Sequence, residues 1–494
     1  MRRPFVRLTS LLLLLAALTA AAVSCAEAPE DKPKETLPPR ETSAETRVTH
    51  DLPPKTFDGY TFNMLHWTEF DVHATDLYVE ESDGDLIADA VFHRNSKLES
   101  ELDISFELEE YSPAEVANKV RTAIRSNEDF YDITFLTLAS VAPVMLEGSF
   151  LDFEQELPYV DLDKPYYDQS LRNQLSFAQR LFLVGSDMSI TDKNATASII
   201  FNKDLARDYE MPDFYAAVRN GEWTLFSFLD AMTCFDGDLN GDGKMNPADD
   251  CYGYIASQDT TLTFFYSAGG RLTDKDEFDL PFSCFSEDEH YDILTAVFDI
   301  IYDPMMLSKA NGGFINNETK TEYFIGQHGL FFWQRMVHII RMRGEEAINF
   351  GILPPPKYDE MQEDYPALIS KRYTGLMSVL SVETDPDTVG YIVEAMAAGS
   401  HYDLQNAYYD ATLKTKSARD DESQDMLDII FAHRAIDIGE VCDFGGFATK
   451  LAEFPFTSNP YNYGIMSTYA SVESKIEDDI YSFLDQIETM EQYR

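Results

Sequence analysis

The sequence predicts an α/β fold, because short apolar runs of strand type alternate with stretches of helical apolar spacing. Strand, helix, strand, helix and strand patterns follow one another between residues 58 and 138, which favours a lobe with a largely parallel sheet. A second series of such patterns begins near Leu181. The chain has 494 residues, which is enough for two lobes of this kind.

The first series begins after the turn at Asp58-Gly59 with a short apolar run. Its second strand is predicted because apolar and polar residues alternate from Ile104 to Leu108. The helix after that strand opens with Pro113, a residue that suits the first helical turn. The predicted elements are strands over residues 60–67, 104–108 and 131–138, and helices over residues 85–102 and 113–126.

The second series contains shorter apolar runs separated by longer polar stretches. Its predicted strands cover residues 181–184, 198–202, 329–333 and 350–353, and its predicted helices cover residues 226–233 and 291–302. A last helix is clear because one apolar face lies opposite acidic residues. That face consists of Val472, Ile476, Ile480, Phe483 and Ile487.

Residues 1–24 have the pattern of a secretory signal peptide. Arginines at positions 2, 3 and 7 precede an apolar run from Leu11 to Val23, which is shorter than the roughly 20 residues that span a bilayer. The next segment, Ala22-Val23-Ser24-Cys25, resembles the bacterial lipobox, although Ala22 stands where Leu is usual. The resemblance implies cleavage before Cys25 and diacylation of its thiol, with an ordinary secretory signal as the alternative.

Residues 25–56 are predicted to form a membrane tether. They are rich in Pro, Glu and Thr, and they hold too few large apolar residues to offset the entropy of ordering. The prolines keep such a segment extended. No later run of 18 apolar residues exists in the sequence, so we expect the folded part to lie on the extracellular face of the membrane, held by the lipid anchor.

The charge of the chain excludes some partners. Its 38 Lys and Arg residues against 87 Asp and Glu residues give a net charge of −49, which argues against nucleic acid and anionic lipid as ligands. An aromatic content of 13% argues against an acidic disordered chain. The cysteines after Cys25 show no zinc-binding spacing, and Cys234 and Cys251 flank one loop and could pair.

One loop has the spacing of a calcium site. Oxygen-bearing side chains stand at loop positions 1, 3, 5, 9 and 12, and Gly243 at position 6 permits a tight turn. We expect a structural calcium ion there, with a solvated acidic turn as the alternative. The predicted ligands are Asp238, Asn240, Asp242, Lys244 through its carbonyl, Asn246 and Asp249.

Known catalytic motifs are absent from the sequence. It contains no G-x-S-x-G, no H-E-x-x-H, no Walker loop and no G-x-G-x-x-G after a strand, so we expect no enzyme and no organic cofactor. With so many acidic residues, the sequence does not exclude a glycosidase, in which two carboxylates meet in a cleft.

Several short segments are each a weak family signal, but their order and spacing along the chain are together more specific. They are Asp89–Asn95, Lys164–Tyr167, Phe201–Leu205, Gly221–Thr224, the acidic loop, Tyr252–Tyr254, Gly351–Tyr358 and Arg419–Ser423. With them, residues 58–494 resemble the extracellular solute-binding proteins of family 1, the sugar-binding lipoproteins of ABC importers of the Firmicutes type. Tyr166 and Tyr167 depart from the family pattern, in which two Trp often stand there.

The resemblance implies a two-lobed fold of the class II periplasmic-binding-protein type, with a ligand cleft between the lobes. Lobe one would comprise residues 58–165 plus 368–412, and lobe two residues 170–365 plus 413–494. The implied function is capture of a carbohydrate, expected to be an oligosaccharide, or of another small solute, by a monomer that delivers it to the transmembrane subunits of an ABC permease. A surface glycan-binding lipoprotein without a permease and a secreted glycosidase are the alternatives.

A sugar cleft needs aromatic platforms with polar groups around them. Trp67 ends the first strand beside His66, and ligands of open α/β sheets collect at the carboxyl ends of strands. Trp333 follows another apolar run, whereas Trp223 opens a helix and is expected in the core. Core packing, or a plain turn at the two glycines, is the alternative role. The predicted ligand-binding residues are Trp333, Trp67, His66, Arg335, Gly269, Gly270, Tyr266, Asp187 and Thr137.

Overall fold

The structure is a computed structural model that describes residues 49–69, 75–234, 237–307, 317–342, 348–413, 421–457 and 463–493. The predicted signal peptide, the lipidation site Cys25 and most of the tether lie outside the described residues. The body from Thr49 to Arg494 is one compact unit, and we describe it by itself. Among its described helices, none combines the length and the apolar character that crossing a bilayer requires.

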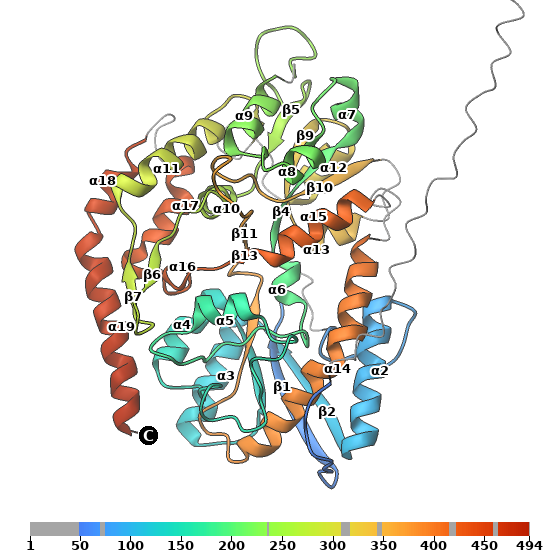
Figure 1. Ribbon diagram of the computed structural model, residues 1–494, viewed down its shortest axis with the longest axis vertical. Helices are drawn as coiled ribbons and strands as arrows, with labels where there is room; N and C mark the ends of the chain where they lie inside the picture. Colours follow the sequence, from blue (N-terminus) through green and yellow to red (C-terminus); the bar gives the residue numbers. More distant parts are fainter. Residues whose placement is uncertain are drawn as a thin grey trace, which may run out of the picture. The chain divides into compact units, whose positions relative to one another are not determined.

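The first sheet has the strand order β12-β3-β1-β2. Its strands β1 (Tyr60–Trp67), β2 (Ile104–Tyr111) and β3 (Ile133–Thr137) run parallel, and β12 (Gly375–Ser378) runs antiparallel beside β3. The helices α2 (Leu86–Leu102) and α14 (Pro386–Leu413) pack against each other, and α3 (Pro113–Ser126) contacts the three parallel strands (Figure 1). The predicted parallel α/β lobe is therefore confirmed.

Local sequence explains why these helices begin and end where they do. The Asp85 carboxylate accepts hydrogen bonds from the first free backbone N–H groups of α2, and Asp103 ends that helix in the left-handed conformation. Ser112 and Glu115 form a capping box at the start of α3, where Pro113 removes an N–H that would lack a partner. These caps fix the spacing between the helices and the parallel strands.

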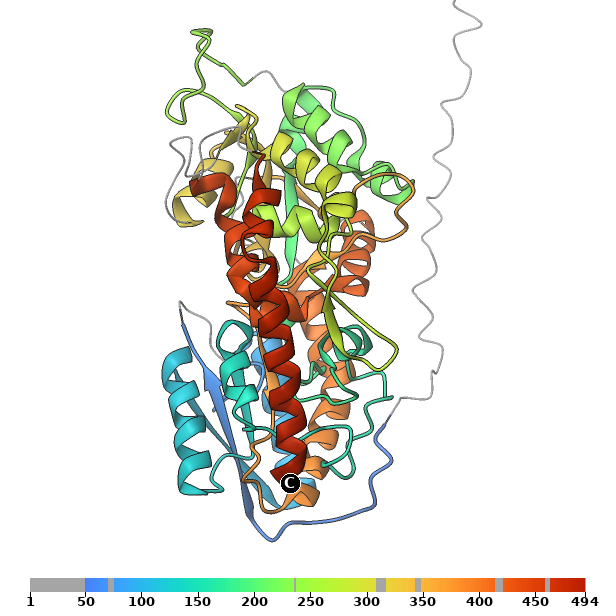
Figure 2. The same ribbon diagram turned by 90° about the vertical axis from the view of Figure 1, so that its left-hand side faces the viewer.

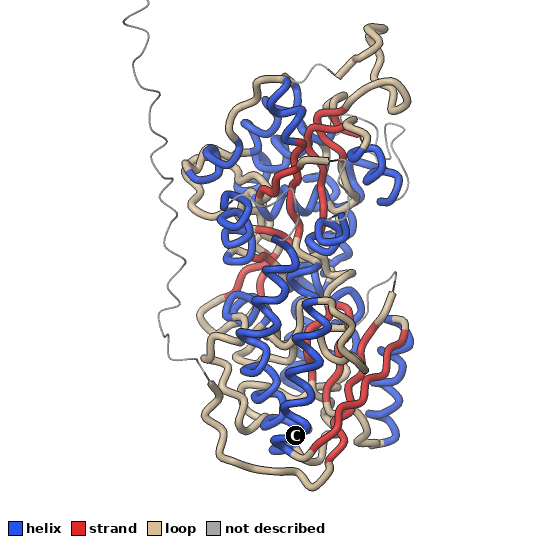
Figure 3. Tube along the Cα trace, turned by 90° about the vertical axis from the view of Figure 1, so that its right-hand side faces the viewer, coloured by secondary structure: helices blue, strands red, loops and turns tan. Residues whose placement is uncertain are grey.

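The second sheet has the order β10-β4-β9-β5-β8. Its strands are β4 (Ala197–Asn202), β5 (Tyr252–Ile255), β8 (Met306–Leu307), β9 (Gly329–Arg335) and β10 (Phe350–Leu353). The strand β4 runs antiparallel to both of its neighbours, and β5 runs parallel to β8 and β9. Figure 3 shows the strands in two separate groups, one for each sheet.

Helices and short strands surround the second sheet and join it to the first. The first helices after β3 are α4 (Leu138–Leu146), which contacts β3 and α3, α5 (Gln169–Leu175), which contacts β13, and α6 (Thr191–Asn194), which contacts β12. The helices that follow them along the chain are α7 (Lys203–Asp208), α8 (Phe214–Arg219), α9 (Leu225–Thr233), α10 (Thr260–Ser267), α11 (Glu287–Ile301), α12 (Asn317–Ile325), α13 (Met336–Arg341) and α15 (Asp421–Ala432). The short strands β6 (Thr273–Lys275) and β7 (Pro281–Ser283) pair with each other, as do β11 (Ala367–Leu368) and β13 (Arg434–Ala435).

The C-terminal segment closes the body. It consists of α16 (Ile438–Cys442), the 3-10 helix η3 (Phe444–Gly446), α17 (Phe447–Thr457), α18 (Ile465–Ala470) and α19 (Glu473–Tyr493). The long helix α19, red in Figure 2, contacts η3, β7 and α4. Four residues of the apolar face predicted for this helix, Ile476, Ile480, Phe483 and Ile487, are buried, which confirms the face. The fifth, Val472, precedes the helix and is half-buried.

One predicted strand is wrong. Residues 181–184 are buried but form no strand, and only Val184 makes an isolated bridge, to Met377. Farther back, Leu181 donates its N–H to the Asp152 carboxylate and accepts the N–H of Phe153. The backbone groups of this run are thus divided between two segments, so no continuous ladder forms although the residues are apolar enough for one.

The chain passes between the sheets three times, after β3, before β12 and after α14. The crossing segments meet at Arg434, which is 7% exposed and forms ion pairs with Asp168 and Asp192. Burial would raise the pKa of the Asp192 carboxyl, but Arg434 and Lys193 hold the pKa below its ordinary value. The predicted lobe boundaries remain predictions, because the two sheets show to which group each strand belongs but do not assign the connecting segments to a lobe.

We expect Arg434→Met to destabilise the protein by ~3–5 kcal/mol, because it leaves the buried Asp192 and the half-buried Asp168 without their shared cation. Urea unfolding measures this change. Arg207→Met is the matched control, since Arg207 pairs with Asp204 and Asp208 at the surface, and its stability should equal that of the parent. A loss below ~1 kcal/mol in Arg434→Met would show that the ion pairs are dispensable.

Candidate functional site

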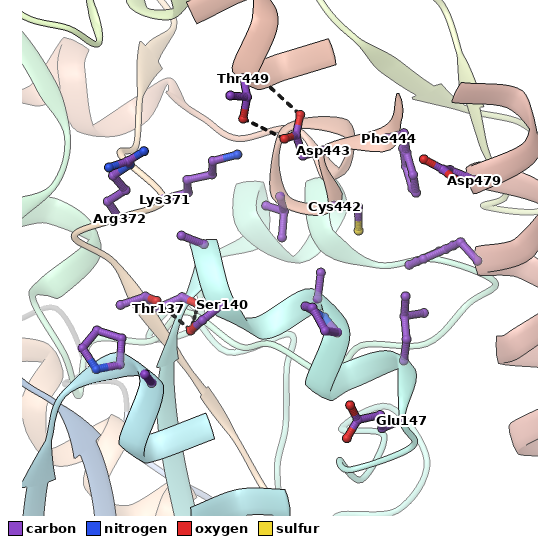
Figure 4. A pocket seen from close by; sticks show the side chains of 18 of the residues that line it. Thr137, Ser140, Glu147, Lys371, Arg372, Cys442, Asp443, Phe444, Thr449 and Asp479 are labelled. Carbon is purple, nitrogen blue, oxygen red and sulfur yellow. Dashed lines mark hydrogen bonds between the residues drawn. The ribbon is translucent and has the colours of Figure 1, made fainter. Parts of the chain in front are cut away.

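A cavity of about 1040 Å³ lies beside the carboxyl end of β3. Its walls come from the start of α4, from the segment 371–373 that leads to β12, and from the C-terminal segment between α16 and α19 (Figure 4). Strands of the first sheet therefore point their carboxyl ends at it, which is where open α/β sheets place ligands. Its volume lies at the upper end of the roughly 300–1,000 Å³ of small-molecule sites.

The first wall is held in place by hydrogen bonds across the crossing segment. The N–H groups of Leu138 and Ala139, at the start of α4, donate to the carbonyls of Thr374 (2.9 Å) and Lys371 (3.0 Å). The hydroxyl groups of Thr137 and Ser140 lie 2.8 Å apart at the same place. This wall therefore offers hydroxyl groups in a fixed arrangement and leaves those two helix N–H groups bonded.

The segment Lys371-Arg372-Tyr373 forms the second wall. Lys371 donates its Nζ to the carbonyl of Glu440 at 2.6 Å. Arg372 is exposed to the cavity, and in the described part of the chain no hydrogen bond or ion pair engages its guanidinium. The Tyr373 ring carries the guanidinium of Arg335 on one face, with Cζ 3.2 Å from the ring centroid.

Arg335 lies behind this wall and is 8% exposed. Its Nε and Nη1 have no hydrogen-bond partner among the described residues, and its Nη2 lies 3.4 Å from Nε2 of His338. Burial, together with Arg335 and Arg341, lowers the pKa of His338 to about 3. The imidazole is therefore neutral, so the positive charge of Arg335 is not shared with it.

Glu440 lies behind the third wall. It is 2% exposed, and within the described residues its Oε2 lacks a hydrogen-bond partner. Burial raises the pKa of this carboxyl to about 8, Lys371 opposes the rise, and Asp437 adds to it. The carboxyl is therefore largely protonated near neutral pH.

Other acidic groups at the cavity already have partners. The Asp443 carboxylate accepts hydrogen bonds from Thr449, through the backbone N–H at 3.1 Å and the hydroxyl at 2.7 Å. The Asp479 carboxylate accepts the N–H of Gly445 at 2.8 Å, and Glu147 pairs with Arg121 at 2.9 Å. Glu69 lines the cavity as an exposed residue.

Of the predicted ligand-binding residues, Thr137 lines the cavity and Arg335 reaches it through Tyr373. Trp67 and His66 are fully buried, with His66 Nδ1 2.5 Å from the Trp67 carbonyl. A side chain at Gly375 would meet the Trp67 indole at 2.5 Å, so this indole packs directly against β12. Both residues therefore lie in the core of the first sheet.

Three of the remaining predicted residues, Trp333, Tyr266 and Gly270, are also packed inside, whereas Gly269 is exposed. Trp333 is 3% exposed and donates its indole N–H to Thr263 at 3.0 Å. Tyr266 is buried near Asp437, and a side chain at Gly270 would strike the Phe265 ring. Gly269 has a φ of +84°, which a turn after α10 requires. Trp223 is buried, as predicted.

Asp187 lies at a second cavity, of about 330 Å³. Its carboxylate is 2.5 Å from Nδ1 of His401 and 3.5 Å from Nζ of Lys193. Arg434 and its two carboxylate partners line the same cavity. Because each of these cations already contacts a carboxylate of the protein, this cavity is explained by the packing of the crossing segments.

The predicted calcium loop curls around its first carboxylate. Asp238 accepts hydrogen bonds from the N–H groups of Gly241, Asp242 and Gly243, and both glycines have positive φ. Across the described ranges, no three His, Cys, Asp or Glu side chains lie close enough together to hold a metal ion. Calcium binding remains a prediction. Cys234 and Cys251 are both free thiols, so the pairing considered for them does not form.

Sequence reasoning missed Lys371, Arg372, Tyr373 and Asp443 as cavity residues. A signal for the first three existed, because two adjacent cations and an aromatic residue interrupt a run of buried residues in an acidic chain. Asp443 and Phe444 carried none, since the turn that brings them to the cavity depends on packing against α19.

Solved structures of bacterial binding proteins share this fold. The sugar-binding protein MalE from Xanthomonas citri aligns with a TM-score of 0.58 and 12% identity, over 86% of this chain and 99% of that chain. UgpB from Mycobacterium tuberculosis, in complex with glycerophosphocholine, aligns with a TM-score of 0.54 and 14% identity, over 87% and 98%. The ABC substrate-binding protein Lmo0181 from Listeria monocytogenes, in complex with cycloalternan, aligns with a TM-score of 0.52 and 11% identity, over 87% and 99%.

No protein-family model and no curated protein sequence matches this chain. At the identities above, the likeness to solved structures concerns the fold. It confirms the predicted two-lobed α/β fold of the periplasmic-binding-protein type, with MalE-like domains.

We expect Glu440→Gln to flatten the pH dependence of stability. The folded protein holds the Glu440 proton more tightly than the unfolded chain does, so this contribution is complete below pH 4.5 and is lost as the pH rises to about 8. Each unit of raised pKa corresponds to about 1.4 kcal/mol. Urea unfolding of parent and variant across this range measures the difference, and parallel pH profiles of the two proteins would contradict the prediction.

Proposed function

We propose that this protein is the substrate-binding lipoprotein of an ABC importer. It captures an oligosaccharide in the 1040 Å³ cavity and delivers it to the transmembrane subunits of the permease, without chemical change of the ligand. The protein acts as a monomer, and a diacylated Cys25 holds it at the extracellular face of the membrane. Mass spectrometry of the mature N-terminus checks the anchor.

The observation that carries the proposal is the mixed lining of this cavity. A sugar presents apolar C–H faces and a rim of hydroxyl groups, so its site needs aromatic surface beside donors and acceptors. Tyr373 and Phe444 supply aromatic surface, Thr137 and Ser140 supply hydroxyl groups, and Arg372 supplies a free donor. The ligands of similar folds support the same class, since Lmo0181 was solved with cycloalternan and a MalE from Bdellovibrio bacteriovorus with maltotriose.

Thermal unfolding of the mature chain against a panel of oligosaccharides tests the proposal. A bound sugar stabilises the folded state by about 2.7 kcal/mol at one hundred times its dissociation constant, so the unfolding midpoint rises. We expect Tyr373→Ala to weaken binding about tenfold, because it removes an aromatic surface worth about 1 kcal/mol or more. Tyr373→Phe keeps the ring and should keep the affinity.

Tyr481→Ala is the matched control, since Tyr481 is an exposed residue of α19 that does not line the cavity. The sugar should be recovered intact after the measurement. Cleaved sugar would make the protein a glycosidase, and a panel without any midpoint shift would contradict carbohydrate capture.

We propose that calcium stabilises the Asp238–Asp249 loop as a structural ion. The curled backbone around Asp238 and the oxygen-rich side chains of the loop support this. We expect calcium chloride to raise the unfolding midpoint of the parent relative to EDTA, and to leave the double variant Asp238→Asn, Asp242→Asn unchanged. An equal effect of calcium on both proteins would place the ion elsewhere, and no effect on either would contradict the proposal.

A further inference from the structure

The charges at the large cavity are unevenly engaged. Its acidic groups Asp443, Asp479 and Glu147 each have a partner within the protein, and its fourth acidic group, Glu69, is an exposed residue. Figure 4 shows Lys371 and Arg372 together at one side of the cavity, away from Asp479 and Glu147. One side of the cavity is therefore cationic, and the acids across from it are already neutralised or hydrogen-bonded.

The cations on that side have few counter-charges. Lys371 donates to a backbone carbonyl, and Arg372 takes part in no hydrogen bond or ion pair of the described structure. Arg335 adds a third positive charge behind Tyr373, and two of its nitrogens lack partners in the described part of the chain. Two acids face this group, namely Asp259, which Ser370 contacts at 3.4 Å, and the buried Glu440.

Those two acids do not balance the three cations. Glu440 is largely protonated near neutral pH, since the pKa of its carboxyl is raised to about 8. Asp437, which lies nearby, is already engaged by the N–H groups of Leu272, Thr273 and Gly439. The three cations Lys371, Arg372 and Arg335 thus outnumber Asp259 and Asp437 at this wall, in a chain whose overall charge is −49.

We infer that the cavity selects an acidic oligosaccharide, one whose sugars carry carboxylate groups. This inference rests on the proposed function and narrows its substrate to uronic-acid oligomers. A carboxylate of the ligand supplies the negative charge that Arg372 lacks within the protein. The planar guanidinium of Arg372 can donate two parallel hydrogen bonds to the two oxygens of such a carboxylate. Tyr373, held from behind by Arg335, offers its ring to the apolar face of the same sugar.

The second cavity supports this reading by contrast. It is also rich in charged residues, but each of its cations already contacts a carboxylate of the protein. The cations of a charged cavity in this protein can therefore all be paired with carboxylates, whereas Arg372 of the large cavity has no such partner among the described residues.

Isothermal titration calorimetry of the full mature protein tests the inference. The probes are trimers of galacturonic acid and of glucuronic acid, each compared with the neutral trimer of the same linkage, and sodium sulfate as a plain anion. We expect at least one acidic trimer to bind about tenfold or more tightly than its neutral counterpart, as a charged hydrogen bond implies. Arg372→Gln should abolish this preference, so that the acidic and the neutral trimer of one linkage bind with affinities that agree within about twofold.

Arg207→Gln is the matched control, because it removes the same charge from an exposed pair outside the cavity. It should keep the preference for the acidic trimer. If both neutral trimers bind as tightly as their acidic counterparts or more tightly, the inference is overturned and the proposed function stands. The same holds if the preference for the acidic trimer survives in Arg372→Gln. Sulfate that competes as strongly as the acidic trimers would show a simple anion site, and failure of every sugar to bind would overturn the proposed function itself.

Discussion

The buried guanidinium of Arg434 is the interaction on which the arrangement of the body depends. It joins Asp168, which caps α5, to Asp192 in α6, and it stands on β13, which pairs with β11. The chain passes from one sheet to the other through these segments, and the segment 371–373 follows β11 by a few residues. Burying a cation here costs desolvation energy, which only nearby carboxylates offset. The segments that carry Asp168 and Asp192 must therefore stay beside Arg434.

The wall of the large cavity follows from that constraint. β11 and β13 are paired, and a few residues after β11 the carbonyls of Lys371 and Thr374 accept the first N–H groups of α4. These hydrogen bonds join the connecting segment to the helix that follows β3. Lys371, Arg372 and Tyr373 then stand against the carboxyl end of β3 without belonging to either sheet. The cationic and aromatic side chains at this cavity therefore lie on connecting backbone, while each sheet keeps its own apolar core.

The sequence predicts the elements with strong local signals and misses features that depend on packing. It predicts β1, α3 and β10 with the observed bounds, because apolar runs, Pro113 and the capping pattern are local. It fails at residues 181–184, where apolar residues are buried without a ladder. The tryptophans were reasonable sugar platforms by residue type, but Trp67 lies against Gly375 and Trp333 bonds to Thr263, contacts that no spacing reveals.

Placing Arg372 on an exposed connecting segment has an evolutionary consequence. Residues of a sheet core change only with their neighbours, since each fills space that others define. Arg372 is exposed, and the hydrogen bonds at the start of α4 use the backbone carbonyls of Lys371 and Thr374, so its replacement leaves both cores and those hydrogen bonds intact. The side chain that faces the cavity at this position can therefore change through a single substitution, without first requiring a compensating change elsewhere in the chain.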